Sequence, residues 1–338
     1  MKRFHKTALA AVLAAGTITG CSYDDEEDEL VGNWVKVSDF DGVARCAAVT
    51  FSVNGTVYIA TGGYGGYKYR LNDLWEFDEV SGTWTQKASM EGPARTYASG
   101  FGTDMYGYVG LGYDGDNYLN DFWRYDPSSN TWTQVSDFGG SARRAAVAFY
   151  AGGNGYVGCG YDGNHLKDFW KYNEGSDTWE QITSIGGSKR MGASAFVIDD
   201  IAYVVGGENN SNVVTDFWSF DPSSGTWTEK REIENVSDDD YDDDYGTIAR
   251  SYGVAFTMYG LGYLTCGENA GSGMTSTWEY NPSDDQWTER TSYEAGTRSE
   301  AVGFSLDNRG FVLTGKSGTY QYDDMWEFFP EEEYNEND

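Results

Sequence analysis

Histidine is almost absent from this chain of 338 residues, which contains only two. His5 lies in the first few positions, so His165 is the one histidine in the rest of the sequence. One imidazole is too little for a zinc site of the usual Cys/His type or for a copper site built on several histidines. The serine-centred G-x-S-x-G motif is missing too. We therefore expect no metal and no cofactor, and although carboxylates are plentiful, the sequence selects no catalytic residue.

Proline and cysteine are also scarce, with five and four residues. Cys21 stands apart near the N-terminus, and the three remaining cysteines are an odd number, which excludes a complete set of intrachain disulfides. We expect Cys46, Cys159 and Cys266 to be small buried thiols. Glycine, in contrast, is abundant (44 residues), and aromatic residues make up 16% of the chain. This composition predicts an all-β protein of many short strands joined by tight turns.

Positively charged residues are also few. The chain has 23 lysines and arginines against 54 aspartates and glutamates, which gives a formal net charge of −31. A surface of this sign repels phosphate backbones, so we expect no nucleic-acid partner. Three basic residues, Lys2, Arg3 and Lys6, fall in the first six positions, which sets the N-terminus apart from the acidic remainder.

The N-terminal apolar segment, 7–19, is short. It spans 13 residues, whereas a transmembrane helix needs about 20. A basic start, a short apolar core and small residues before a cleavage point are typical of a secretory signal peptide, here residues 1–20. Its end, Ile18-Thr19-Gly20-Cys21, resembles the lipobox of bacterial lipoproteins. The resemblance implies cleavage before Cys21, to which diacylglycerol and a fatty acid such as palmitate are attached as a durable anchor; an ordinary signal peptide with a chance cysteine is the alternative.

An acidic block follows at once, with six acidic residues between positions 24 and 29. Such a block cannot pack into a core, so we interpret residues 21–30 as a solvated tether and residues 331–338 as an acidic tail. The block also resembles the export signal that sends some lipoproteins to the outer face of the outer membrane. This resemblance implies an exported protein that is anchored to the outer membrane and faces the cell exterior, although any solvated linker would have a similar composition.

The sequence between these segments repeats one unit six times. Each unit starts with an arginine. Counted from this arginine, a small residue stands three positions later, phenylalanine six, an aromatic residue 13 and glycine 17 positions later, and no gaps are needed to align the six units. Trp-x-[Phe/Tyr] comes next, and in five units a second tryptophan follows nine residues later. We interpret each unit as four short strands, a to d, which is one blade of a β-propeller. The arginines are Arg45, Arg95, Arg143, Arg190, Arg250 and Arg298.

Two features of the unit point to a known repeat. Gly62-Gly63 and Gly206-Gly207 end strand b, and an aromatic residue and a tryptophan seven residues apart follow. This pattern resembles a kelch repeat, although the double glycine is broken in four units. The resemblance implies an all-β, six-bladed kelch-type β-propeller over residues 31–330, with four antiparallel strands per blade.

The sixth unit lacks its second tryptophan, because Asn335 stands there. The segment Gly32-Asn33-Trp34 resembles the missing strand d, and Trp34 precedes Arg45 by the usual 11 residues. We therefore expect this N-terminal strand to complete the last blade, which leaves no open sheet edge.

The d–a and b–c connections of such a meander share one face, and the length variation of the repeats falls there. Variable loops on a uniform scaffold commonly carry binding residues. The b–c loops combine tyrosine with amides and carboxylates, which suits sugars, because rings cover the apolar side of a pyranose and polar groups bond its hydroxyls. The same residues also make good turns, and this alternative stays open. The candidates are Tyr64, Tyr67, Tyr69, Tyr113, Asp114, Asn117, Tyr118, Tyr161, Asn164 and His165.

The six repeat arginines are expected near the central opening of the same face. Guanidinium groups bind carboxylates with two hydrogen bonds, and arginines at this place contact acidic peptides in some kelch proteins, so we keep all six as candidate binding residues. An aspartate two residues before the strand-c tryptophan recurs in five units, with Ser276 in the other. Repetition in nearly every blade predicts instead a structural ion pair between neighbouring blades.

One d–a loop, between Trp227 and Arg250, is longer than the others and contains six aspartates within 237–244. Clustered carboxylates are calcium ligands, but the glycine and the spaced glutamate of a known calcium loop are missing. We expect a solvated acidic loop above the binding face.

These features predict a monomeric, non-catalytic binding protein that is attached to the membrane through its lipid alone and binds a glycan. A scaffold for other envelope proteins is the first alternative. The second is an enzyme acting on sugar rings, similar to kelch-type sialic acid epimerases and mutarotases, whose site residues cannot be placed here. An asymmetric, buried cluster of arginine and glutamate at the channel mouth would favour catalysis over binding.

Overall fold

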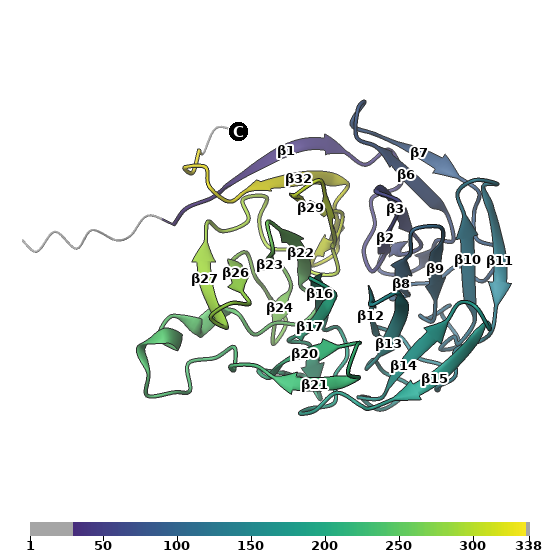
Figure 1. Cartoon of the computed structure of the whole chain (residues 1–338). Coiled ribbons are helices and arrows are strands. Elements are labelled where there is room, and N and C mark those ends of the chain that lie inside the picture. Colours follow the sequence, from purple (N-terminus) through teal and green to yellow (C-terminus); the bar gives the residue numbers. More distant parts are fainter. Residues whose placement is uncertain (1–29, 336–338) are drawn as a thin grey trace, which may run out of the picture.

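Each repeating unit folds into one four-stranded antiparallel sheet, in which buried and half-exposed residues alternate along the inner strand. A computed structural model describes residues 30–335 and arranges the six sheets as blades around a central channel (Figure 1). The six-bladed propeller predicted from the sequence is confirmed. Residues 1–20 and Cys21, the predicted signal peptide and lipid site, lie outside the described part.

The four strand positions recur in every blade. The innermost strands, a, are β2 (Val49–Val53), β8 (Ser99–Gly102), β12 (Val147–Ala151), β16 (Ser194–Ile198), β22 (Val254–Met258) and β28 (Val302–Leu306). The b strands are β3 (Thr56–Ala60), β9 (Gly107–Gly110), β13 (Asn154–Gly158), β17 (Ile201–Val205), β23 (Leu261–Thr265) and β29 (Arg309–Leu313). The c strands are β6 (Leu74–Asp78), β10 (Phe122–Asp126), β14 (Phe169–Asn173), β20 (Phe217–Asp221), β26 (Thr277–Asn281) and β32 (Asp324–Phe329). The outer strands, d, are β7 (Thr83–Lys87), β11 (Thr131–Val135), β15 (Thr178–Ile182), β21 (Thr226–Glu229), β27 (Gln286–Arg290) and β1 (Asn33–Asp39).

Four of the b–c connections form small hairpins of their own. These are β4 (Gly63–Tyr64) with β5 (Tyr69–Arg70), β18 (Glu208–Asn209) with β19 (Asn212–Val213), β24 (Glu268–Asn269) with β25 (Ser272–Gly273), and β30 (Lys316–Ser317) with β31 (Tyr320–Gln321). The helices in the described part are two short 3-10 turns, η1 (Asp240–Asp242) and η2 (Tyr245–Thr247). Among residues 30–335, no helix has the length and apolarity needed to cross a membrane.

The repeated aromatic positions build the core of the blades. The phenylalanine of strand a stacks on the aromatic residue of strand b in every blade, as Phe51 does on Tyr58 with ring centroids 5.3 Å apart. The other pairs are Phe101–Tyr108, Phe149–Tyr156, Phe196–Tyr203, Phe256–Tyr263 and Phe304–Phe311. These stacks explain why the two positions repeat without gaps, because each buries two rings against the next blade.

The N-terminal strand closes the ring as predicted. β1 pairs antiparallel with β32, and Trp34 lies opposite Phe328. The Trp34 side chain is fully buried, contacts the rings of Tyr293 and Phe328 at 4.8 and 4.7 Å, and donates a hydrogen bond of 3.3 Å from Nε1 to the Thr291 carbonyl. The last blade therefore depends on a strand from the opposite end of the sequence.

The propeller has two different faces. We call the face with the b–c and d–a connections the loop face, and the face with the a–b and c–d turns the turn face. The turn between β2 and β3 is the tight pair Asn54-Gly55, with φ of 48° and 78°, as a two-residue hairpin requires. Asn33 of β1 pairs with Phe329 at the end of β32, so the described chain enters the propeller from the turn face.

The long acidic insertion lies at the outer side of blades 4 and 5, beside β27 (Figure 1). Tyr245 and Ile248 anchor it in the core that these blades share, and the Trp287 backbone N–H donates to the Tyr245 hydroxyl at 2.6 Å. The Asp242 carboxylate accepts hydrogen bonds from the backbone N–H groups of Val236 and Ser237. The insertion is thus held by apolar packing and by its own turn.

Candidate functional site

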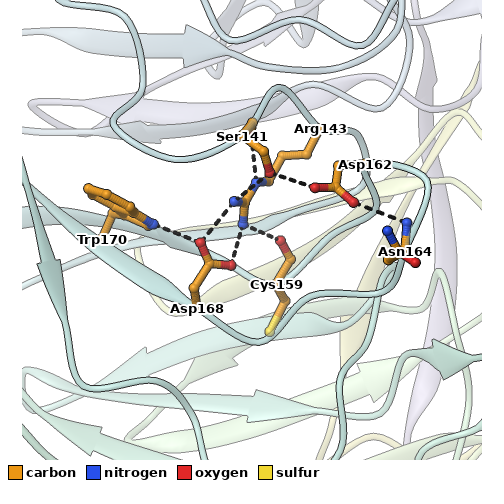
Figure 2. Close-up of polar contacts among 7 residues, drawn as sticks. All are labelled: Ser141, Arg143, Cys159, Asp162, Asn164, Asp168 and Trp170. Atoms are coloured by element: carbon orange, nitrogen blue, oxygen red, sulfur yellow. Dashed lines mark hydrogen bonds and ion pairs between the residues drawn. The ribbon is translucent and has the colours of Figure 1, made fainter.

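The repeat arginines are buried inside the blades. Arg143, at the start of strand a in blade 3, forms a two-pronged pair with Asp168, with N–O distances of 2.7 and 2.8 Å (Figure 2). Its remaining donors bond the carbonyls of Cys159 and Ser141 and the Ser141 hydroxyl, so all five guanidinium N–H groups have partners. Trp170 also donates to Asp168, at 2.8 Å. Arg143 is fully engaged in holding together three segments of its own blade.

The same pair recurs in four other blades, as Arg45–Asp73, Arg95–Asp121, Arg190–Asp216 and Arg298–Asp324. In blade 5, Arg250 bonds the Ser276 hydroxyl at 2.8 Å instead, and burial lowers its pKa to about 10. All six arginines are at most 1% exposed. The pairs lie within single blades, which corrects the expectation of ion pairs between blades, because each arginine and its aspartate precede strands a and c of the same sheet.

Neighbouring blades are joined through the backbone instead. The glycine that ends strand b donates to the carbonyl of the next blade's arginine, as Gly112 does to Arg143 at 2.8 Å. Gly112 has a φ of +97°, and a Cβ atom built there would lie 2.7 Å from the Thr96 carbonyl oxygen. Both the backbone conformation and the close approach therefore require glycine at this repeat position.

The polar b–c loop candidates serve mainly as turn residues. Asp114 accepts hydrogen bonds from the backbone N–H groups of Asp116 and Asn117, at 2.8 and 2.7 Å, and the Asn164 N–H donates to Asp162 at 3.0 Å. The side chains of Asn117 and Asn164 are exposed. This geometry agrees with the turn interpretation of these residues.

The aromatic candidates form two groups on the loop face. Tyr64 and Tyr69 stack at 4.9 Å within the β4–β5 hairpin, while Tyr67 points to the centre and joins a cluster described below. The second group joins blades 2 and 3, because Tyr118 contacts Tyr113 at 5.6 Å and Tyr161 at 6.0 Å. His165 contacts Tyr161 at 5.1 Å, and burial lowers the pKa of its imidazole.

The central opening of the loop face is framed by a closed ring of backbone hydrogen bonds. The residue two positions after each repeat arginine donates its N–H to the carbonyl of its counterpart in the preceding blade, with distances of 2.7 to 3.3 Å around the circle. All six residues have a left-handed backbone, with φ between 51° and 62°. We call this set the mouth ring: Ala47, Tyr97, Ala145, Gly192, Tyr252 and Glu300.

The side chains of the mouth ring break the symmetry of its backbone. Three members are alanine or glycine, whereas Tyr97, Tyr252 and Glu300 carry large side chains. The left-handed conformation costs every member except Gly192 about 1–2 kcal/mol. Because the conformation is the same in every blade, the members differ in their side chains alone. The six residues line a cavity of about 150 Å³ at the channel entrance.

A buried carboxylate lies at this entrance. Glu300, whose side chain is 5% exposed, accepts hydrogen bonds from the hydroxyls of Tyr67 and Tyr97, each at 2.7 Å from Oε1, and pairs with Lys316 at 2.8 Å. The Lys316 ammonium also contacts the Tyr67 hydroxyl. We call Tyr67, Tyr97, Glu300 and Lys316 the Glu300 cluster; its members come from blades 1, 2 and 6 and meet across the seam where the ring closes.

Burial, reinforced by the Glu300 carboxylate, raises the pKa of the Tyr67 and Tyr97 hydroxyls far above the usual range. Both tyrosines therefore stay protonated and act as neutral hydrogen-bond donors. Burial likewise raises the pKa of the nearby Cys46 thiol to about 12, which leaves it unreactive at neutral pH.

The other side of the mouth carries three charged groups. Glu208 and Glu268 stand at equivalent positions in blades 4 and 5, and burial together with the Glu268 charge raises the pKa of Glu208. The Arg144 guanidinium lies over the rings of Tyr97 and Tyr161, at 5.3 and 5.7 Å. Within residues 30–335, these three side chains form no hydrogen bond or ion pair with protein atoms. They remain able to bond a ligand.

Sequence reasoning selected Tyr67 but missed Tyr97, Arg144, Tyr252, Glu300 and Lys316. A signal for Tyr97, Tyr252 and Glu300 exists in the repeat alignment, because the position two after each arginine varies among Ala, Tyr, Gly and Glu, whereas the next position is always Ala or Gly. In the described part, no group of three or more His, Cys, Asp or Glu side chains is arranged to hold a metal ion.

Two family models match the chain. One, described as the KLHDC2/KLHL20/DRC7 Kelch-repeats domain, matches residues 33–207, and the Kelch motif model matches residues 189–232. None of the curated proteins matches the chain. The first match spans half of the sequence and seven of its tryptophan-bearing c and d strands, and the second covers blade 4. Together with the six four-stranded blades, these matches show that the chain belongs to the kelch-repeat family of β-propeller proteins.

Proposed function

We propose that this kelch propeller is the binding module of a lipid-anchored envelope protein and that it binds a glycan, without catalysis, at the mouth of its channel. Kelch propellers commonly serve as binding or scaffold modules. The observation that carries the proposal is the asymmetry of the mouth ring. Repeat positions that hold the blades together are nearly uniform, whereas the six positions around the entrance carry Ala, Tyr, Gly or Glu on the same left-handed backbone.

The groups at the mouth suit a polyhydroxylated ligand. Tyr97 and Tyr252, whose ring centroids are 5.8 Å apart, offer aromatic surface for the apolar side of a sugar ring. Glu208 and Glu268 supply acceptors for hydroxyl protons, and Arg144 supplies donors. A glycan uses both kinds of group at once, whereas a purely apolar ligand would leave these charges desolvated and unpaired.

The bonding of Glu300 favours binding over catalysis. A general base needs a lone pair that can reach the substrate. Oε1 of Glu300 already accepts from Tyr67, Tyr97 and Lys316, and Oε2 lies 2.6 Å from the Tyr67 hydroxyl. We interpret Glu300 as the residue that positions the two tyrosines.

An enzyme acting on a sugar ring is the second candidate. The sequence predicted that an asymmetric cluster of arginine and glutamate at the mouth would favour catalysis, and Arg144 lies there with Glu208 and Glu300. Glu208 is the residue to test, because burial and the Glu268 charge raise the pKa of its carboxyl, a direction that favours proton donation.

The proposed anchor is consistent with a mouth that points away from the membrane. Cys21 lies 12 positions before Asn33, a span of at most about 40 Å. Because Asn33 enters at the turn face, a lipid on Cys21 would draw that face toward the membrane. The proposed location is the outer membrane, with the loop face exposed to the exterior. Acylation is tested by mass spectrometry of the envelope fraction; a Cys21→Ser protein that stays membrane-bound would refute the anchor.

The binding proposal is tested with soluble protein from Ser22 to Asp338. We expect one class of saccharide to raise the melting temperature, since a ligand at 100 times its Kd adds about 2.7 kcal/mol of stability. Tyr252→Ala should weaken binding about tenfold or more, corresponding to at least about 1.4 kcal/mol. Tyr259→Ala is the matched control, because Tyr259 is an exposed tyrosine on the turn face.

Three outcomes separate the candidates. Binding that is lost in Tyr252→Ala and kept in Tyr259→Ala supports the mouth as the site. Conversion of the bound sugar to an epimer or anomer, followed by NMR and lost in Glu208→Gln, would establish the enzyme instead. Absence of any saccharide effect, with capture of an envelope protein, would replace the glycan with a protein partner.

A further inference from the structure

The loop face carries a continuous line of aromatic side chains that leads from the rim of the propeller to its mouth. It begins in blade 2 with Tyr113 and Tyr118, 5.6 Å apart, and crosses to Tyr161 of blade 3 over 6.0 Å. Arg144 then joins Tyr161 to Tyr97 of the mouth ring, with its guanidinium 5.7 and 5.3 Å from the two ring centroids. We call these five residues the aromatic track.

The residues of the track are partly exposed, so their surfaces are accessible. Tyr113, Tyr118 and Tyr161 are half-buried, which holds each ring in place and leaves part of it in solvent. Arg70 lies over the Tyr113 ring at 5.2 Å and supports its outer end. Aromatic rings that are fixed by their neighbours lose little conformational entropy on binding, which favours affinity.

The track has a direction because blades 4 and 5, beyond the mouth, offer no comparable surface. The hairpins of blades 4 and 5, residues 208–213 and 268–273, contain no aromatic residue. On that side Glu208 and Glu268 face the entrance instead. The Glu300 cluster occupies the seam between blades 6 and 1, where its donors and acceptors are bonded to one another.

The cavity at the mouth is small. Its volume of about 150 Å³ is below the ~300–1,000 Å³ of pockets that bury a whole drug-sized molecule. It therefore has room for one unit of a larger ligand, and the remainder must lie on the surface outside.

We propose that the protein recognises the end of a linear oligosaccharide, with the terminal sugar in the mouth and the following units stacked along the aromatic track. This inference rests on the proposed glycan binding and adds the form of the ligand. Each added unit meets one more ring, while the Arg144 N–H groups, which bond no described residue, are positioned to donate to hydroxyls of the unit between Tyr97 and Tyr161. Glu208 and Glu268 accept from the hydroxyls of the terminal sugar.

The test measures how affinity depends on chain length. Calorimetric titrations of residues 22–338 use three series of one to six units: cello-oligosaccharides, malto-oligosaccharides and oligomers of N-acetylglucosamine. In the series that binds, we expect affinity to rise at least tenfold between one and four units and then to level off. Tyr161→Ala and Tyr118→Ala should abolish this rise and leave the affinity for the single sugar unchanged.

The control variant lies on the same face but outside the track. Tyr320, in blade 6, is 62% exposed and, among the aromatic residues of 30–335, contacts Tyr322 alone, so Tyr320→Ala should preserve the full length dependence. Equal affinity for one and six units, or a length dependence that survives in both track variants, would overturn the inference and leave glycan binding intact. If no series binds at any length, the proposed function fails, and the inference fails with it.

Discussion

Removal of one repeat arginine tests whether these residues are structural. In Arg143→Ala, the Asp168 carboxylate loses both guanidinium hydrogen bonds and keeps that from Trp170 at 2.8 Å, and the carbonyls of Cys159 and Ser141 lose their guanidinium donors. Breaking a buried pair from one side costs about 3–5 kcal/mol, because the remaining charge stays buried without compensation. Asp168 is 22% exposed and can regain some hydration, so we expect a value near the lower limit, about 3 kcal/mol.

This free energy corresponds to a measurable shift of the melting temperature. Unfolding entropy is about 2.1 cal/mol/K per residue, or roughly 0.6 kcal/mol/K for a propeller of about 300 residues. A loss of about 3 kcal/mol therefore lowers the midpoint by about 5 °C. Differential scanning calorimetry or the near-UV circular dichroism of the tryptophans would detect this change.

The matched control is an exposed ion pair in the same blade. Lys171 and Glu180 lie 2.9 Å apart but are 29% and 65% exposed, so Lys171→Ala should cost less than about 1 kcal/mol and shift the midpoint by less than about 2 °C. An Arg143→Ala protein that melts within 1 °C of the unsubstituted protein would refute the structural role. It would also return the six arginines to the candidates for ligand binding.

Two further predictions concern ring closure and acid stability. Trp34→Ala should lower the free energy of unfolding by about 3–5 kcal/mol, because the Trp34 side chain is fully buried and links β1 to the last blade. An unchanged unfolding transition in calorimetry would contradict closure of the ring by β1. Burial alone would raise the pKa of Asp168, but its hydrogen bonds from Arg143 and Trp170 outweigh burial and hold that pKa below the usual range. The Asp168 carboxylate therefore stabilises the fold fully above the unfolded-state pKa of about 3.9, and this stabilisation is lost as the pH falls through the lower folded-state pKa. In urea titrations below about pH 4, Asp168→Asn should lose less stability with falling pH than the unsubstituted protein does.

The propeller could be predicted because its determinants are local and repeated. The stacked pair formed by Phe51 and Tyr58 lies within one hairpin, and its equivalents recur every 47 to 60 residues, so the strand order inferred for one unit applies to all six. Closure was predictable for the same reason, since the sequence around Trp34 matches the strand that the sixth unit lacks. Trp34 then pairs as its repeat equivalents do.

The roles of individual polar residues were harder to predict, because sequence spacing does not show which groups bond one another. The repeat pattern placed arginine and aspartate together but assigned their contact to neighbouring blades, whereas Arg143 and Asp168 belong to one sheet. The acidic insertion was expected as a solvated loop above the binding face, and the sequence did not show that Tyr245 anchors it in the core of blades 4 and 5. In both cases burial decided the outcome, since a guanidinium or a tyrosine ring lies where its partners remove it from water.

The sequence by itself determined the repeat, the number of blades and the strand that closes the ring, since each follows from patterns shorter than one blade. Only the tertiary structure decided the composition of the mouth. Tyr67, Tyr97, Glu300 and Lys316 span almost 250 positions of the chain and meet because the ring brings its first and last blades together. The physical reason is closure itself, which turns one variable position per repeat into a single circle of six side chains around a common axis.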